Sequence, residues 1–141
     1  MDTHQESGRY WSTVTMMRAW IIRGLKGLSV DQLDFQIDDQ SNSIGAMLLH
    51  LAATEKYYQL RTFDEMAWGS WLEEIKKEWE LPMNLGEDGR KLIVGHDSNY
   101  YLTKLEEVRK VIKKEFAKTD DTWLMKSEPF FDNLPTNNHA K

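Results

Sequence analysis

The four histidines of this 141-residue chain are the first candidates for chemistry, because imidazole binds metals and exchanges protons near neutral pH. His4, His50, His96 and His139 are separated by 46, 46 and 43 residues, so the chain has no pair of histidines four residues apart on one helix. His50 is the strongest candidate, because it falls within a segment predicted to be a buried helix. There its imidazole needs either a ligand or, as the alternative, a backbone or side-chain hydrogen-bond acceptor.

Glu55 is the second unusual residue, because on a helical wheel it falls between Leu51 and Tyr58, inside an apolar stripe. A buried carboxylate must be paired, protonated or bound to a metal. The alternative is that the stripe widens here and Glu55 reaches the edge of the helix bundle. Tyr58 adds a phenol to the same helix, and the six tryptophans, including Trp71, either line an apolar pocket or form core and subunit contacts.

Composition excludes several other kinds of chemistry. The chain has no cysteine, which rules out disulfides, thiolate zinc sites, iron–sulfur ligation and a cysteine nucleophile. It also lacks a glycine-rich phosphate loop, a serine nucleophile elbow and a calcium-binding loop. Eighteen basic and twenty-three acidic residues give a net charge of −5 without a long basic run, so a nucleic-acid partner is not expected.

Hydropathy predicts neither a membrane partner nor secretion. No stretch approaches the roughly 18 consecutive apolar residues of a membrane span. Residues 1–8 are polar and acidic, unlike a signal peptide, so the expected location is the cytoplasm.

The elements that must position these residues are predicted to be a few long helices, because the chain has only three prolines and eight glycines. Apolar residues at steps of three and four predict helices near 8–27, 44–63 and 98–118. The helix at 44–63 is apolar almost all the way round, as expected of a helix buried between neighbours. The stripe of the first helix consists of Tyr10, Val14, Met17, Ile21, Leu25 and Leu28.

Shorter segments connect these helices. Residues 28–37 are predicted to form a turn and a short extended or helical connection. The tryptophan-rich residues 66–80 are predicted to form a short lid-like helix that Pro82 ends, and the glycine-containing residues 84–96 are predicted to be a linker. The chain beyond residue 119 is predicted to be irregular.

Residues 43–58 read Ser-Ile-Gly-Ala-Met-Leu-Leu-His-Leu-Ala-Ala-Thr-Glu-Lys-Tyr-Tyr and follow Gly-Leu-Ser-Val-Asp-Gln-Leu-Asp-Phe at 27–35. This phrase resembles the second-helix signature of the DinB-like superfamily. Residues 85–91, 96–105 and 120–125 are similar to a bacterial branch of that superfamily with a longer insertion before the third helix. The resemblance covers most of the chain and implies one all-α domain over residues 1–141, a four-helix bundle of the up-down-down-up type.

The resemblance also implies a function. The superfamily includes candidate metal-dependent enzymes related to thiol-dependent S-transferases, and His50 occupies the position of its first metal ligand. Glu55 would then contact a metal ligand and orient it without binding the metal itself. Tyr58 and Trp71 would line the pocket. The expected activity is a transferase that uses a low-molecular-weight thiol, or a hydrolase, acting on a small molecule. Its divalent metal, zinc or nickel in the first place, would lower the pKa of a bound thiol or water.

The chain departs from the superfamily at the other two ligands, which are a pair of histidines four residues apart on the final helix. That helix is largely missing here, and His139 resembles only the segment that leads into it. Three helices built to surround a fourth would leave an apolar groove. We expect that the sequence is a fragment, or that the helix near Trp71 or a second subunit fills the groove, which favours a homodimer. The alternative function is a non-catalytic bundle that serves as a small-ligand binder or a dimeric interaction module.

Overall fold

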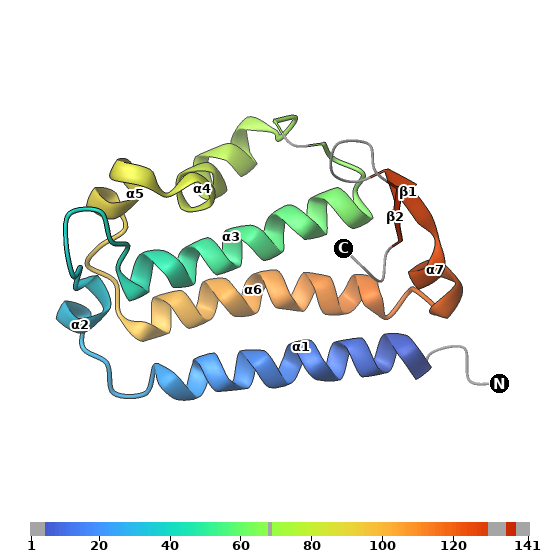
Figure 1. Ribbon diagram of the computed structural model, residues 1–141, viewed down its shortest axis with the longest axis horizontal. Helices are drawn as coiled ribbons and strands as arrows, with labels where there is room; N and C mark the ends of the chain where they lie inside the picture. Colours follow the sequence, from blue (N-terminus) through green and yellow to red (C-terminus); the bar gives the residue numbers. More distant parts are fainter. Residues whose placement is uncertain (1–4, 68, 130–134, 138–141) are drawn as a thin grey trace.

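The computed structural model describes residues 5–67, 69–129 and 135–137, and these are predominantly helical, as predicted (Figure 1). None of the described helices combines the length and the apolarity that crossing a membrane requires. The elements in chain order are α1 (Gln5–Gly24), α2 (Val30–Asp34), α3 (Ile44–Phe63), α4 (Glu73–Asn84), α5 (Gly86–Leu92), α6 (Ser98–Phe116), α7 (Asp121–Met125), β1 (Ser127–Pro129) and β2 (Pro135–Asn137), the two strands pairing antiparallel.

Helix α3 is the centre of the fold and begins and ends at the predicted residues. The Ser43 side chain accepts the Ala46 backbone N–H at 3.1 Å, which satisfies one of the free donors of the first turn. Helix α3 packs against α6 on one side and against α4 on another (Figure 1). The prediction of a helix buried between neighbours is confirmed only in part, because Ile44 and Met47 are 45% and 48% exposed. The buried residues of α3 are Gly45, Ala46, Leu48, Leu49, Ala52, Ala53, Tyr57, Gln59 and Leu60.

Helices α3 and α6 approach each other tightly where Tyr101 lies against Gly45. Tyr101 is completely buried, and a Cβ atom on Gly45 would lie 2.7 Å from its Cζ atom. Burial, with a smaller contribution from the Asp34 carboxylate, raises the pKa of Tyr101 to about 12. Its phenol therefore stays neutral at physiological pH, and glycine is the residue that permits this helix spacing.

Helix α1 lies mainly against α6 and α7, with the Trp11 and Phe116 rings 6.3 Å apart. It begins and ends three residues earlier than predicted. Leu25 of the predicted stripe is buried and Ile21 half-buried, but Met17 is 53% exposed, so the prediction that Met17 lies in the core is wrong. The side of α1 on which Met17 lies is open to solvent, and Met16 and Trp20 are 49% and 65% exposed as well.

The segment between α3 and α6 differs most from the prediction. The tryptophan-rich helix begins only at Glu73, and Pro82 lies inside it rather than ending it. Pro82 has no N–H to donate to the backbone carbonyl four residues earlier, so α4 continues past it with one hydrogen bond fewer. Leu85, with a φ of 52°, separates α4 from α5, and α5 occupies residues that were predicted to be a linker.

The chain after α6 is also more ordered than predicted. The Asp120 side chain accepts the Trp123 N–H at 2.9 Å and starts α7, and the β1–β2 hairpin follows. The described residues beyond α6 include no fourth long helix. The described part of the chain therefore contains three long helices, α1, α3 and α6, with α4 packed against α3 (Figure 1), and the predicted four-helix bundle stays a prediction.

We predict that Gly45→Ala lowers the free energy of unfolding by about 1–3 kcal/mol, because the added methyl group overlaps Tyr101 in a packed core. Gly24→Ala is the matched control, since no atom lies within 4 Å of its added Cβ. Urea denaturation followed by circular dichroism measures both. A Gly45→Ala variant as stable as Gly24→Ala would contradict the tight α3–α6 contact.

Candidate functional site

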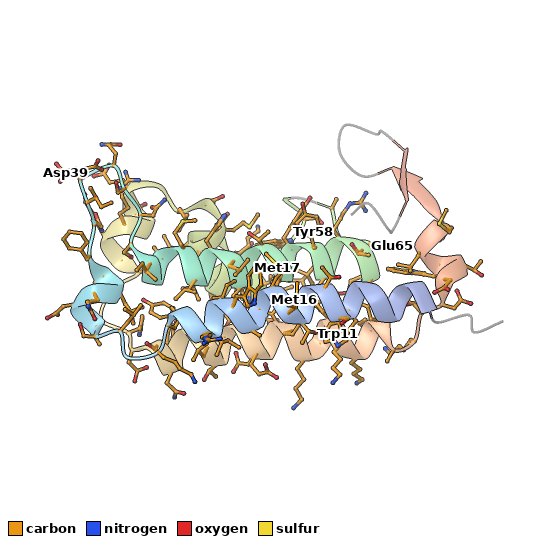
Figure 2. The ribbon with its side chains drawn as sticks, turned by 60° about the horizontal axis from the view of Figure 1, so that its bottom comes forward. Trp11, Met16, Met17, Asp39, Tyr58 and Glu65 are labelled. Carbon is orange, nitrogen blue, oxygen red and sulfur yellow. The ribbon has the colours of Figure 1, made fainter. Side chains whose placement is uncertain are left out.

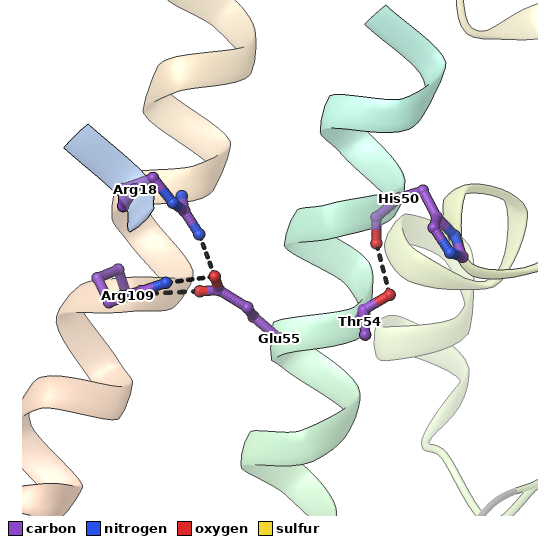
Figure 3. A network of polar contacts seen from close by, with 5 residues as sticks. All are labelled: Arg18, His50, Thr54, Glu55 and Arg109. Carbon is purple, nitrogen blue, oxygen red and sulfur yellow. Dashed lines mark hydrogen bonds and ion pairs between the residues drawn. The ribbon is translucent and has the colours of Figure 1, made fainter. Parts of the chain in front are cut away.

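Glu55 lies between two arginines from two other helices (Figure 3). Its carboxylate accepts hydrogen bonds from Arg18 of α1 and Arg109 of α6, including one of 3.1 Å from Arg109 Nε. The side chains of Arg18, Glu55 and Arg109 are 9%, 16% and 11% exposed. The buried carboxylate of Glu55 is therefore paired with positive charges. These ion pairs connect the three long helices α1, α3 and α6.

The cluster carries one more positive than negative charge. Burial lowers the pKa of Arg18, Glu55 opposes this shift, and the second guanidinium at Arg109 adds to it. Arg109 also lies over the Trp11 ring, with its Cζ 5.7 Å from the ring centroid. The Glu55 carboxylate thus balances buried charge and holds helices together.

Arg18 and Arg109 were missed as partners of Glu55 when the sequence was considered alone. A signal existed, because Arg18 lies three residues before Ile21 and Arg109 lies four after Leu105, which places both beside apolar stripes. A charged residue beside a buried stripe needs an opposite charge. Nothing in the local spacing indicates that both arginines share the same carboxylate.

His50 lies on the side of α3 that faces α4, and its Nδ1 lies 2.9 Å from the Pro82 carbonyl oxygen. A carbonyl only accepts hydrogen bonds, so Nδ1 carries the proton and donates it, and Nε2 of the neutral ring keeps a free lone pair. In the described part of the chain, Nε2 has no hydrogen-bond partner. The Thr54 hydroxyl donates to the His50 backbone carbonyl at 2.9 Å (Figure 3).

An open groove of about 410 Å³ lies along α3, with α1 as its other wall. Met16 and Met17 of α1 are exposed but do not line this groove. Figure 2 shows both on α1, which lies in front of α3 and α6 in this view. The groove that the sequence predicts for a bundle without its fourth helix stays a prediction, and the groove described here is an open apolar surface beside α3. We call it the α1–α3 groove. It is lined by Ile21, Asn42, Ser43, Ile44, Met47, Leu48, His50, Leu51 and Thr54.

The other predicted pocket residues lie elsewhere. Trp71 is buried with its ring 6.4 Å from that of Tyr57, and it borders a separate small cavity of about 80 Å³. The half-buried Tyr58 does not line the α1–α3 groove. The walls of the groove come from α1, from α3 and from the residues just before α3, and the expectation that the helix near Trp71 takes the place of a missing fourth helix stays a prediction.

The structure does not bring Glu55 to His50. The two side chains leave α3 toward different neighbours, Glu55 toward α1 and α6, and His50 toward α4 (Figure 3). This geometry therefore does not support the expectation that Glu55 orients His50 as a metal ligand.

The residues present do not complete a metal site. Among the described residues, no group of three His, Asp or Glu side chains lies close enough to hold an ion. His50 fits one ligand position through Nε2. The half-buried His96 stacks on Tyr100 at 3.8 Å between ring centroids, and His4 and His139 lie outside the described residues.

Comparison with models of known protein families finds no match to this chain, and searches of curated proteins and of solved structures find no similar protein. The DinB-like resemblance rests on the sequence phrases alone.

We predict that Glu55→Gln lowers the free energy of unfolding by about 3–5 kcal/mol, because it leaves two buried guanidinium groups without a counter-charge. Glu74→Gln, at an exposed position of α4, is the matched control and is expected to change stability by less than about 1 kcal/mol. Guanidinium chloride denaturation at pH 7 measures both. Equal effects of the two substitutions would show that the cluster does not stabilise the bundle.

Proposed function

We propose that this protein binds a small molecule in the α1–α3 groove. Both functions that the sequence favoured, an enzyme acting on a small molecule and a small-ligand binder, require such a site. The observation that carries the proposal is the groove itself, whose volume of about 410 Å³ lies in the range of ligand pockets, roughly 300–1,000 Å³. Its walls combine apolar side chains with a few polar groups, which is the usual composition of such pockets.

The polar groups define the chemistry of the ligand. His50 offers the lone pair of Nε2, which accepts a hydrogen bond. The ligand is therefore an apolar body that carries an O–H, N–H or S–H donor, and a low-molecular-weight thiol belongs to this class.

A metal-dependent enzyme of the DinB-like kind is the second candidate. It is favoured by His50, whose Nδ1–H donates to a backbone carbonyl, as the non-ligating nitrogen of metal-bound histidines commonly does. The described residues supply no second and third ligand, so we derive no reaction step through a metal. In this candidate the ion would be zinc or nickel, and the reaction a thiol-dependent transfer or a hydrolysis.

The experiment uses 2-naphthol and its methyl ether, 2-methoxynaphthalene, which share an apolar body and differ in the O–H donor. We predict that the protein binds 2-naphthol about fivefold more tightly, the equivalent of one net hydrogen bond of about 1 kcal/mol. His50→Phe removes the difference, and Met47→Glu abolishes binding of both compounds because it places a charge in the groove. Fluorescence titration measures the affinities.

Met125→Glu is the matched control, since Met125 is an exposed methionine on α7, away from the groove. Binding that Met47→Glu and Met125→Glu reduce equally, or no binding at all, would contradict the proposal. Equilibrium dialysis against Zn²⁺ separates the second candidate. One bound ion per chain that is lost in His50→Phe and kept in His96→Phe would support the metal-dependent enzyme.

A further inference from the structure

A second apolar surface lies at the end of the molecule where the residues after α2 meet α5. We call it the end patch and define it by Phe35, Ile37, Leu92 and Val94. Phe35, Ile37 and Leu92 are 67%, 84% and 64% exposed, and Val94 is exposed as well. Monomeric soluble proteins rarely gather large exposed apolar side chains at one place unless the surface meets a partner.

Two hydrogen bonds hold the two halves of the end patch together. The Gly95 backbone N–H donates to Asp34 Oδ2 at 2.7 Å, and Gln36 Nε2 donates to the Arg90 carbonyl at 3.0 Å. These bonds fix residues 34–36 beside residues 90–95, and Figure 1 shows α2 and α5 at the same end of the molecule. The patch is thus a preformed surface, separate from the α1–α3 groove and from the Glu55 cluster.

The two segments that form the end patch carry more negative than positive charge, although Arg90 acts on the Asp38 carboxylate. Residues 30–39 contain four aspartates and no basic residue, and residues 86–94 contain two acidic and two basic residues. This small part of the chain therefore carries a net charge of −4, whereas the whole chain carries −5. A partner that covers the apolar side chains must approach through this negative field.

We propose that the end patch docks a polypeptide segment whose apolar side chains are flanked by lysine or arginine. The apolar side chains supply the buried area, and the surrounding carboxylates select a cationic partner and accelerate its association. A second copy that docked through the same patch would be repelled, because each copy contributes a net charge of −4 from these segments. An anionic membrane surface would be repelled for the same reason.

The experiment measures fluorescence anisotropy of three labelled nine-residue peptides, alternating leucine–lysine, serine–lysine and leucine–glutamate. We expect the leucine–lysine peptide to bind at least tenfold more tightly than the other two, because only it matches both the apolar and the charged part. Phe35→Ser/Ile37→Ser weakens this binding at least tenfold. Asp38→Asn/Asp39→Asn weakens it and reduces its dependence on salt concentration.

The matched control is Leu72→Ser/Met125→Ser, which removes two exposed apolar side chains outside the end patch and the α1–α3 groove and is expected to leave the affinity unchanged. All substituted side chains are exposed, so circular dichroism should show unchanged folding. Equal affinity of Phe35→Ser/Ile37→Ser and the wild type would overturn the proposal. A wild-type dimer that Phe35→Ser/Ile37→Ser converts to a monomer would overturn it too, as would binding to anionic phospholipid vesicles.

Discussion

One carboxylate, that of Glu55, joins the three long helices of this protein. It lies on α3 and pairs with Arg18 of α1 and Arg109 of α6, so the positions of all three helices depend on one buried group. The dependence is greatest for α1. Helices α3 and α6 also share a tight apolar contact at Gly45 and Tyr101, whereas α1 lies mainly against α6 and α7. Without Glu55, two guanidinium groups would be buried without compensation.

The placement of α1 creates the α1–α3 groove. Helix α3 is covered by α6 and α4, and its remaining side, with Ile44, Met47 and Leu51, stays open beside Ile21 of α1. Helix geometry separates the two polar residues of α3, because five residues correspond to about 140° of rotation. Glu55 therefore points to α1 and α6, while His50 points to α4 and borders the groove. One residue holds the bundle together, and the other is available to a ligand.

Local patterns predicted much of this arrangement. Apolar residues at steps of three and four predicted the limits of α3, and these limits are confirmed. The predictions failed where contacts between residues far apart in the chain determine the structure. Leu85 adopts a positive φ that its residue type does not indicate, and it separates α4 from α5. Neither the shared pairing of Arg18 and Arg109 nor the hydrogen bond from His50 to the Pro82 carbonyl is visible in local spacing, because each joins residues far apart in the chain.

The most direct test of the central claim is the distance between α1 and α3. The chain has no cysteine, so spin labels can be attached to Ala19→Cys on α1 and Thr62→Cys on α3 alone. Pulsed electron paramagnetic resonance should give a single narrow distance distribution in the protein with Glu55. The same pair in a Glu55→Gln background should give a broad distribution, because α1 loses its attachment. An equally narrow distribution in both backgrounds would contradict the claim that Glu55 positions α1.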